Sequence, residues 1–288
     1  MTILVTGATG TIGRVVVEQL VARGASVRAY VRDPARAQLP AGVALAKGDM
    51  LDIDGFRAAL SGVSTLFLLT AVAADEVTQS LTALNLAREA GIERIVYLSV
   101  IHGALYADVP HFAGKAVVER MIEATDMAAT ILQPAYFMNN DAAIRDVVTN
   151  YGVYPMPLGD KGIAMVDARD VGEVAALELL RRNRAPGPLP RLRIPLVGPD
   201  TLTGTEAAAV WSAALNREIA YGGEDGAGFE QTLRATMPAW MAFDMRMMAA
   251  RFAAHGMIPE AGDRARLTAM LGRPLHDYRT FVAGLTAA

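Results

Sequence analysis

The sequence predicts an α/β protein with a doubly wound parallel β-sheet and a small, mostly helical cap toward the C-terminus. Three observations support this prediction. Short runs rich in β-branched residues alternate with longer helical stretches through the first half of the chain. Several runs, such as residues 95–98, are apolar at every position, which is typical of strands covered on both faces. A glycine turn at residues 7–13 follows the first of these runs directly.

The individual elements follow from the periodicity of each run and from the glycines that end helices. Strands are expected at residues 2–6, 26–32, 43–47, 65–70, 94–100, 128–132 and 192–197. Helices are expected at residues 12–23, 54–60, 75–90, 111–125 and 170–182. Asp167 and Asp170 are expected to cap and charge the last of these helices. The crossovers between the strands should be right-handed.

Beyond Pro134 the alternation changes. Residues 136–162 are rich in tyrosine, proline and glycine and are expected to leave the sheet as an irregular excursion, and the chain after residue 198 is mostly helical. We therefore predict a core of residues 1–135 with 163–197, and a cap of residues 136–162 with 198–288.

Composition excludes several classes of protein. With 27 basic and 30 acidic side chains the net charge is −3, and no basic stripe suited to a nucleic acid is present. The absence of cysteine excludes disulfides, thiolate zinc sites and thiol nucleophiles. The uncharged run at residues 58–74 is too short and too polar to cross a bilayer. The first residues run directly into an apolar strand pattern without a basic segment or a cleavage site, so no secretory signal is expected. We expect a cytoplasmic protein with no membrane partner.

Motifs of other enzyme classes are missing. The sequence has no Gly-x-Ser-x-Gly elbow, no His-Glu-x-x-His and no Walker loop. The histidines at positions 102, 111, 255 and 276 lack the spacing of metal ligands, so no metal is expected.

The glycine turn predicts a dinucleotide phosphate site in a Rossmann-like fold. Gly7 permits a tight turn, Gly10 lets a pyrophosphate approach the backbone, and Gly13 lets the helix pack closely on its strand. The helix N-terminus then offers free N–H groups to the phosphates. The expected ligands are Gly7, Thr9, Gly10, Thr11, Ile12 and Gly13. The alternative, glycines that only shape a turn, is less consistent with a strand before and a helix after them.

The Gly-x-x-Gly-x-x-Gly spacing resembles the short-chain dehydrogenase/reductase superfamily, and Gly-Ala-Thr-Gly at residues 7–10 resembles its atypical and extended branches. Residues 130–140, Thr-Ile-Leu-Gln-Pro-Ala-Tyr-Phe-Met-Asn-Asn, are similar to the "ILRPxxFMxN" stretch of the NmrA-like group. Matching segments at residues 166–171, 196–203, 215–217 and 271–274 extend this resemblance over essentially the whole chain. The group includes NADP-sensing transcriptional co-regulators, quinone oxidoreductase 2-type reductases, triphenylmethane reductase and, more distantly, isoflavone reductases.

The resemblance also assigns roles along residues 130–140. It implies that Pro134, Tyr136 and Phe137 line the nicotinamide end of the cofactor and that Asn140 lies near the substrate mouth. For the two aromatic residues, a place in the core is the alternative. Gln133 departs from the family, which commonly has arginine there, and this change is expected to loosen an ion pair.

The end of the second strand predicts which nicotinamide cofactor binds. Arg32 stands where a guanidinium would bind a 2′-phosphate, so NADP, as NADPH, is expected in preference to NAD. Asp33 beside it is the kind of residue that binds the ribose of NAD, so NAD is the less favoured cofactor. For Arg32 itself, an exposed side chain with no ligand is the alternative.

The ends of the next two strands fit the same site. Asp49 is placed to accept a hydrogen bond from the adenine amino group, with Met50 lying on the ring; a turn cap is the alternative for Asp49. Thr70 and Ala71 are small residues past which the cofactor can run.

The superfamily's Tyr-x-x-x-Lys motif reads His111-Phe-Ala-Gly-Lys115 here. By the resemblance, Lys115 holds the cofactor ribose, whereas pairing with Glu119 one turn on is the alternative. His111 replaces the proton-donating tyrosine, and its side chain suits either acid/base catalysis or simple packing. Ser99 matches the superfamily's serine, unless it is only a local cap. These three are the predicted catalytic residues.

The substrate is expected in the cap, near Tyr154, Trp240 and Phe243 as well as Asn140, with Tyr151 a further candidate. A methionine and aromatic stripe like that at residues 238–248 is more often simply a helix core, and this interpretation is the favoured one for the stripe. We predict an NADPH-dependent reductase that transfers hydride to a quinone-like or aromatic carbonyl molecule, as a monomer or homodimer. The alternative is a non-catalytic NADP-binding redox sensor.

Overall fold

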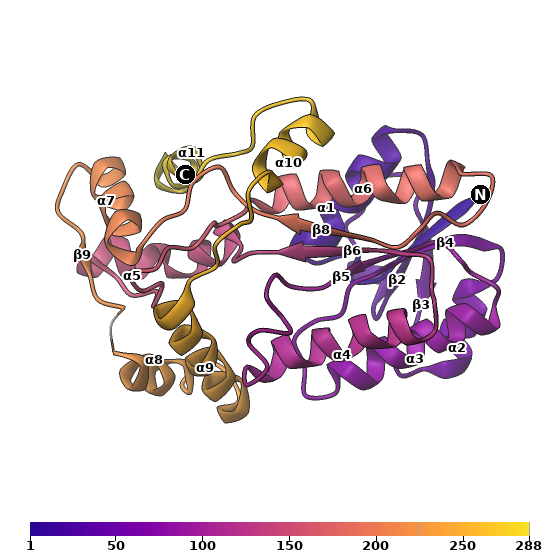
Figure 1. Ribbon diagram of the computed structural model, residues 1–288, viewed down its shortest axis with the longest axis horizontal. Helices are drawn as coiled ribbons and strands as arrows, with labels where there is room; N and C mark the ends of the chain where they lie inside the picture. Colours follow the sequence, from indigo (N-terminus) through magenta and orange to yellow (C-terminus); the bar gives the residue numbers. More distant parts are fainter. Residues whose placement is uncertain (224, 288) are drawn as a thin grey trace. The chain divides into compact units, whose positions relative to one another are not determined.

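The computed structural model describes residues 1–223 and 225–287. The larger of its two sheets has seven strands in the order β3-β2-β1-β4-β5-β6-β8 (Figure 1). The strands are β1 Thr2–Val5, β2 Ser26–Val31, β3 Ala44–Lys47, β4 Val63–Leu68, β5 Ile95–Leu98, β6 Ala129–Pro134 and β8 Leu192–Leu196. Every pair from β3 across to β6 is parallel. The predicted fold class is therefore confirmed.

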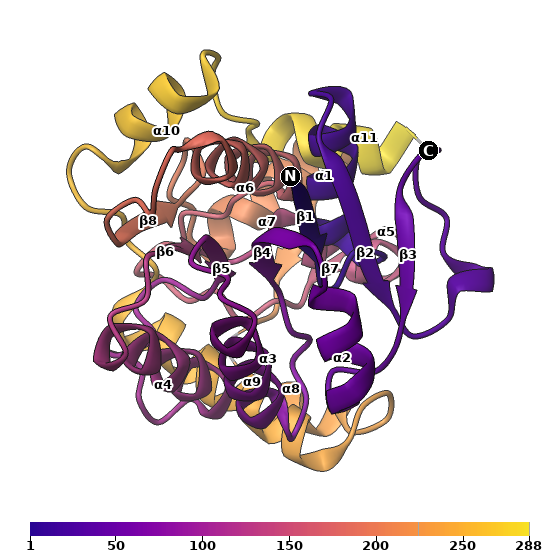
Figure 2. The same cartoon turned by 90° about the vertical axis from the view of Figure 1, so that its right-hand side faces the viewer.

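The strand order reverses direction beside β1. The chain runs outward from β1 to β2 and β3 on one side, and returns to build β4, β5, β6 and β8 on the other (Figure 2). Val5 pairs with Ala29 of β2 and with Phe67 of β4, so the carboxyl ends of these strands meet at one edge. Ligands of doubly wound sheets bind at this kind of reversal point.

Helices cover both faces of the sheet. Helices α1 (Thr11–Ala22) and α6 (Ala168–Arg184) lie on one face, and α2 (Ile53–Leu60), α3 (Glu76–Glu89) and α4 (Pro110–Ala124) on the other (Figure 1). A Cβ atom at Gly172 of α6 would lie 2.4 Å from the Val15 side chain, so glycine lets α6 approach α1 closely. Cover on both faces explains why the strands are apolar at every position.

The core on the second face is a continuous apolar cluster. It contains Tyr30 and Phe56, whose rings pack edge to face with their centres 5.0 Å apart. Leu66 and Tyr97 of the sheet belong to the same cluster. Leu84 of α3 and Ile122 of α4 complete the cover. Burying a large apolar side chain stabilises a fold by about 1.5–3 kcal/mol, which holds these helices on the sheet.

The remaining elements are mostly helical. They are the short 3₁₀ helices η1 (Pro34–Arg36) and η2 (Met138–Ile144), the two-stranded pair β7 (Val153–Tyr154) and β9 (Ala220–Tyr221), and the helices α5 (Arg145–Tyr151), α7 (Gly204–Leu215), α8 (Gly226–Leu233), α9 (Ala239–His255), α10 (Asp263–Leu271) and α11 (Tyr278–Ala287). Within the described ranges no helix has the length and apolarity needed to span a membrane.

The chain divides into two compact units. The first comprises residues 1–100, 114–133 and 168–194, and the second residues 101–113, 134–167 and 195–288. The sequence prediction placed residues 101–113, 134–135, 163–167 and 195–197 with the sheet, and here it differs from this division. The reason is specific pairing within the second unit: the Tyr106 hydroxyl donates to the Gly256 carbonyl, and Ile163 bridges to both Leu202 and Met257.

Every predicted strand and helix is present, with ends displaced by at most two residues. The prediction of an irregular excursion at residues 136–162 is wrong in part, because η2, α5 and β7 lie there. Helix α5 has only seven residues and ends at Gly152, whose φ of 69° is left-handed. A helix this short leaves little periodicity in the sequence.

Candidate functional site

The glycine turn has the geometry expected from its spacing. Gly7 has a φ of +63°, and a Cβ there would lie 2.9 Å from Leu69. A Cβ at Gly13 would lie 2.0 Å from the Gly7 carbonyl oxygen, so the fold itself requires both glycines. Gly10 is exposed, and its added Cβ would have one near neighbour, the Gly7 oxygen at 3.3 Å. The open side of Gly10 therefore leaves backbone accessible to a ligand.

The N-terminus of α1 is open to a ligand. Gly10 is the N-cap residue, no side chain caps the first turn, and no acidic residue lies within it. Thr9 and Thr11 beside it are exposed. Uncapped N–H groups and the positive end of the helix dipole attract phosphate. Because this turn lies at the reversal point of the sheet, the residues present fit the diphosphate of a dinucleotide.

Arg32 and Asp33 play different parts at the end of β2. The Asp33 carboxylate accepts a hydrogen bond from the Ala35 backbone N–H at 3.1 Å and caps η1. Arg32 is exposed, and within the part of the chain that the structure describes it has no hydrogen bond or ion pair. The guanidinium is thus available to an anion, whereas the carboxylate is engaged in its own turn.

The strand ends at Asp49 and Thr70 are already hydrogen-bonded within the protein. Asp49 is exposed and its carboxylate accepts from the Leu51 N–H at 3.1 Å, which is the turn-cap geometry. Met50 packs against the apolar core. Thr70 is buried and donates to Glu76, while Ala71 is exposed. Of these four predicted cofactor ligands, Asp49 and Ala71 are exposed, Met50 is partly buried and Thr70 is buried.

Lys115 has a partner that the sequence did not indicate. Its Nζ donates to Glu76 Oε1 of α3 at 2.6 Å, and both side chains are almost fully buried. Glu76 also accepts from Thr70, which contacts Ser80 at 3.1 Å. The alternative pairing of Lys115 with Glu119 does not occur.

Glu119 instead binds Ser99 and Gln133. The Ser99 hydroxyl donates to Glu119, and the Gln133 amide donates to both carboxylate oxygens at 3.0 and 3.2 Å. Arg193 of β8 approaches the same carboxylate at 3.3 Å. The Glu119 carboxylate is thus contacted by the Gln133 amide and by the Arg193 guanidinium, which supplies a positive charge.

His111 is held by a buried aspartate of α9. Its Nδ1 lies 2.8 Å from Asp244 Oδ1, and its backbone N–H donates to Asp244 Oδ2 at 3.2 Å. The Phe112 ring packs edge to face against the imidazole, with 4.5 Å between the ring centres. The imidazole is thus fixed in place at the first turn of α4.

The stretch after β6 enters a second buried polar cluster. Pro134 and Tyr136 are buried, Phe137 is half-buried and Asn140 is exposed. The Tyr136 hydroxyl donates to Asp141 at 3.0 Å, so its polar end is occupied within the protein.

Asp141 is the centre of that cluster. It is fully buried and accepts from three tyrosines: Tyr136, Tyr154 at 2.8 Å and Tyr278. Burial raises the pKa of Asp141 to about 6, and the three hydroxyl donors act against this rise. Tyr154 is completely buried, so its predicted place in a substrate pocket is corrected to one in the core.

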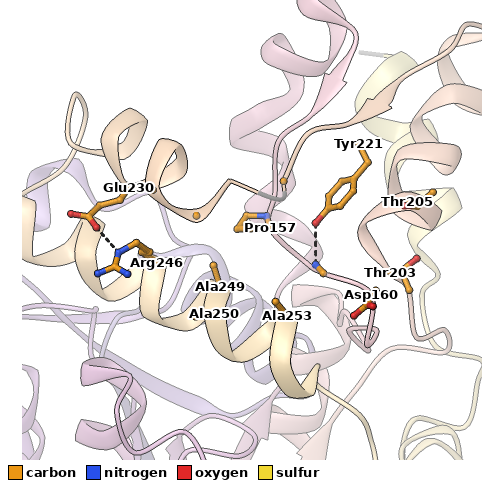
Figure 3. A pocket seen from close by; sticks show the side chains of 14 residues that line it. Pro157, Asp160, Thr203, Thr205, Tyr221, Glu230, Arg246, Ala249, Ala250 and Ala253 are labelled. Atoms are coloured by element: carbon orange, nitrogen blue, oxygen red, sulfur yellow. Dashed lines mark hydrogen bonds and ion pairs between the residues drawn. The ribbon is translucent and has the colours of Figure 1, made fainter.

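The second unit contains a cavity of about 750 Å³ (Figure 3). The Arg246–Glu230 ion pair, at 2.6 Å, lies at one end, and the Tyr221 hydroxyl, which accepts from the Gly159 N–H at 3.0 Å, lies toward the other (Figure 3). The wall between them is formed by small side chains of α9. The lining residues are Pro157, Gly159, Asp160, Thr203, Thr205, Tyr221, Gly223, Gly226, Ala227, Glu230, Arg246, Ala249, Ala250 and Ala253.

The predicted substrate residues of α9 lie outside this lining. Trp240 and Phe243 are 40% and 42% exposed, and the guanidinium of Arg246 lies 4.9 Å from the centre of the Phe243 ring. Phe243 therefore contacts Arg246, which lines the cavity, and does not line the cavity itself. Among the described residues no group of histidine, aspartate and glutamate side chains could hold a metal ion.

Comparison with known protein families matches residues 1–275 to the NmrA-like family. The chain belongs to this family. The resemblance inferred from residues 7–13 and 130–140 is thereby confirmed.

The relatives of this NmrA-like protein include an azoreductase and a quinone oxidoreductase. It is 35% identical over 226 residues to NAD(P)H azoreductase of Xenophilus azovorans, across 76% of each chain. It is 27% identical over 241 residues to quinone oxidoreductase 2 of Escherichia coli, across 81% of each. The solved structure of the Escherichia coli NADPH-dependent quinone oxidoreductase complexed with NADPH shares its fold, with a TM-score of 0.86 and 24% identity over 98% of this chain and 99% of that one.

Sequence reasoning missed three residues in this NmrA-like protein: Glu76, Asp141 and Asp244. Each is a buried carboxylate, and only Asp141 lies beside a family motif. A charge in an otherwise apolar helical face, as at Asp244 in residues 238–248, was the one available signal.

Proposed function

We propose that this protein is an NADPH-dependent reductase of aromatic acceptors such as quinones, aromatic carbonyls or azo compounds. The observation that carries the proposal is the uncapped N-terminus of α1, reached over Gly10 at the reversal point of the sheet. The named activities of the azoreductase and quinone oxidoreductase relatives support the reaction class.

The cofactor proposed is NADP(H). The residues that would hold it are those of the glycine turn for the diphosphate, Arg32 for the 2′-phosphate and Lys115 for the ribose. Engagement of Asp33 in its own turn supports NADP over NAD, because the carboxylate that would bind the NAD ribose is already occupied. When bound, the cofactor supplies the hydride.

The protein itself must then orient the cofactor and the acceptor, exclude water from both and transfer a proton. Glu76 holds the Lys115 ammonium in one place, which orients it for a ribose hydroxyl. His111 provides a titratable nitrogen where the superfamily has a tyrosine. Ser99 is turned toward Glu119, which favours a supporting role for this serine over direct contact with the substrate.

We further propose that the aromatic part of the acceptor binds in the cavity of the second unit. Its volume of about 750 Å³ suits a small molecule. The small side chains along α9, Ala249, Ala250 and Ala253, give it a flat wall that an aromatic ring can approach.

A second candidate function follows from one observation, the histidine in place of the superfamily's tyrosine. A protein that binds NADP and does not turn it over, as a redox sensor, needs no proton donor at that position.

Titration and turnover together separate the candidates. NADPH and NADH are titrated by cofactor fluorescence, and NADPH oxidation is followed with quinones, aromatic ketones and azo dyes. We expect NADPH to bind at least ten-fold more tightly than NADH, and turnover with at least one acceptor class. Binding without any turnover would support the sensor, and failure of NADPH to bind would refute both.

A glycine variant tests the observation that carries the proposal. Gly10→Val places a side chain over the open backbone and is expected to weaken NADPH binding at least ten-fold while the circular dichroism spectrum is unchanged. The control is Gly187→Ala, since Gly187 has no atom within 4 Å of an added Cβ. Normal NADPH binding by Gly10→Val would contradict the assigned site.

A further inference from the structure

The carboxylate of Asp244 contacts His111 at two points. One carboxylate oxygen lies 2.8 Å from Nδ1 of the ring and the other accepts from the His111 backbone N–H at 3.2 Å. The Asp244 side chain is 1% exposed and that of His111 is 9% exposed. Because the two oxygens of the buried Asp244 carboxylate contact the ring and the backbone of His111, they hold both parts of this residue in place.

The contact determines which ring nitrogen carries the proton. A carboxylate offers only lone pairs, so the 2.8 Å contact requires the hydrogen to be on Nδ1. In neutral imidazole the other nitrogen, Nε2, is then without a proton. Among residues 1–223 and 225–287, Nε2 has no hydrogen-bond partner. The nitrogen that can exchange a proton is thus the one that the protein leaves unengaged.

We infer that Asp244 is a positioning residue that fixes His111 in the Nδ1–H tautomer and makes Nε2 the nitrogen that exchanges protons with the acceptor. The inference rests on the proposed reductase function and deepens it. It gives the altered motif a chemical role, because a carboxylate-oriented imidazole can transfer a proton where the superfamily uses a phenol.

The step served is a single proton transfer. The Nε2–H bond of the protonated ring breaks, and an O–H or N–H bond forms on the acceptor. The ring returns to its neutral form with Nδ1–H still donated to Asp244. The cofactor proposed for this site, NADPH, would supply the hydride that balances the two-electron reduction, and the His111 ring would regain its proton from water.

An asparagine at position 244 would reverse the tautomer. The His111 backbone N–H always donates, so the amide oxygen of the asparagine must take that bond. Its NH₂ group then faces Nδ1, which can accept only without a proton. The size and the backbone hydrogen bond are kept, and Nε2 becomes the protonated nitrogen in the neutral ring.

The test is the tautomer of His111 in the full-length protein, measured by long-range ¹H–¹⁵N correlation spectra of ring-labelled histidine. The chain has four histidines, and His111→Gln identifies the signal. We expect the Nδ1–H pattern in the wild type and the Nε2–H pattern in Asp244→Asn. A neutral wild-type ring protonated on Nε2 would overturn the inference, and this measurement requires no variant of Asp244 to fold.

Kinetics provide the second readout. Asp244→Asn is expected to lower kcat about 100-fold, with NADPH affinity unchanged, and to have no further effect in the His111→Gln background. The matched control is Asp108→Asn, which removes a different contact between residues 101–113 and α9, the 2.7 Å pair with Arg251. Normal kcat in Asp244→Asn would refute the role of the contact in the reaction.

The two proposals fail in different ways. A wild-type protein that binds NADPH but reduces no acceptor refutes the reductase function and, with it, the catalytic part of this inference. The tautomer spectra still decide, independently of turnover, whether Asp244 positions the ring.

Discussion

Lys115 Nζ and Glu76 Oε1 form an ion pair of 2.6 Å, buried on the α3/α4 side of the sheet. The lysine comes from a family motif and the glutamate from the first turn of α3, which no motif marks. The same glutamate accepts a hydrogen bond from the Thr70 hydroxyl, just after the end of β4. One carboxylate thus connects the predicted ribose ligand to the edge of the sheet where the cofactor is proposed to bind.

Neutralising the glutamate should destabilise the protein strongly. In Glu76→Gln the Lys115 ammonium stays buried without its counter-charge, and the loss of one partner of a buried pair costs about 3–5 kcal/mol. We expect the free energy of unfolding, measured by urea titration, to fall by this amount.

The control is the exposed pair Arg57–Glu89, whose side chains are 52% and 59% exposed. Glu89→Gln should lower stability by less than about 1 kcal/mol, because water screens such a pair. Equal effects of the two substitutions would show that burial does not strengthen the Glu76 contact.

Arg32 should determine the choice of cofactor. Arg32→Ala removes a guanidinium that has no partner among the described residues, and we expect the Kd for NADPH to rise at least ten-fold while that for NADH is unchanged. Fluorescence titration of both cofactors measures this. Arg36→Ala, in the neighbouring η1, is the control and should change neither value. A parallel loss of NADH affinity would assign Arg32 to another part of the site.

Features that depend on neighbours in the sequence could be predicted, and features that depend on distant pairing could not. The glycine turn is local, since Gly7 and Gly13 contact each other across one turn, and so its geometry follows from spacing. The partners of Lys115 and His111 are 39 and 133 residues away in the chain. The local pattern of α4 favours Glu119, which lies one turn along the same helix, whereas Glu76 comes within reach of Lys115 only once α3 has packed beside α4.

The same limit explains the error at Tyr154. An aromatic residue in a stretch with prolines and glycines looks like part of a loop that faces a ligand. The Tyr154 hydroxyl is buried because it is one of three tyrosine hydroxyls that donate to Asp141. Another of the three, Tyr278, lies 137 residues beyond Asp141 in the chain. The cluster exists only in the folded chain.

Asp141 should make stability depend on pH. Burial raises its pKa from 3.8 to about 6, so the folded state holds this proton more tightly than the unfolded state. The stabilising contribution is complete below about pH 4 and is lost as the pH rises through about 6. This difference in pKa corresponds to about 3 kcal/mol.

The measurement is the stability of the wild type relative to Asp141→Asn, which cannot titrate, by urea unfolding at pH 4 and pH 7. We expect the wild type to lose about 2 kcal/mol relative to the variant between these values, because part of the full effect already lies below pH 4. Asp54→Asn, which removes a carboxylate from a side chain that is 99% exposed, is the control. A pH-independent difference for Asp141→Asn would mean that the carboxylate titrates normally.

The cavity wall of α9 should control affinity for the acceptor. Ala250→Phe places a ring in the cavity of about 750 Å³, and we expect KM for an aromatic acceptor to rise at least ten-fold, with NADPH affinity unchanged. Ala254→Phe makes the same change one turn further along the helix, at an exposed residue that does not line the cavity, and should leave KM as it is. Because both variants add the same apolar surface to the same helix, a difference between them reports on the cavity and not on the stability of α9. An unchanged KM in Ala250→Phe would place the acceptor elsewhere and leave the cofactor assignment intact, since that assignment depends on Gly10 and Arg32.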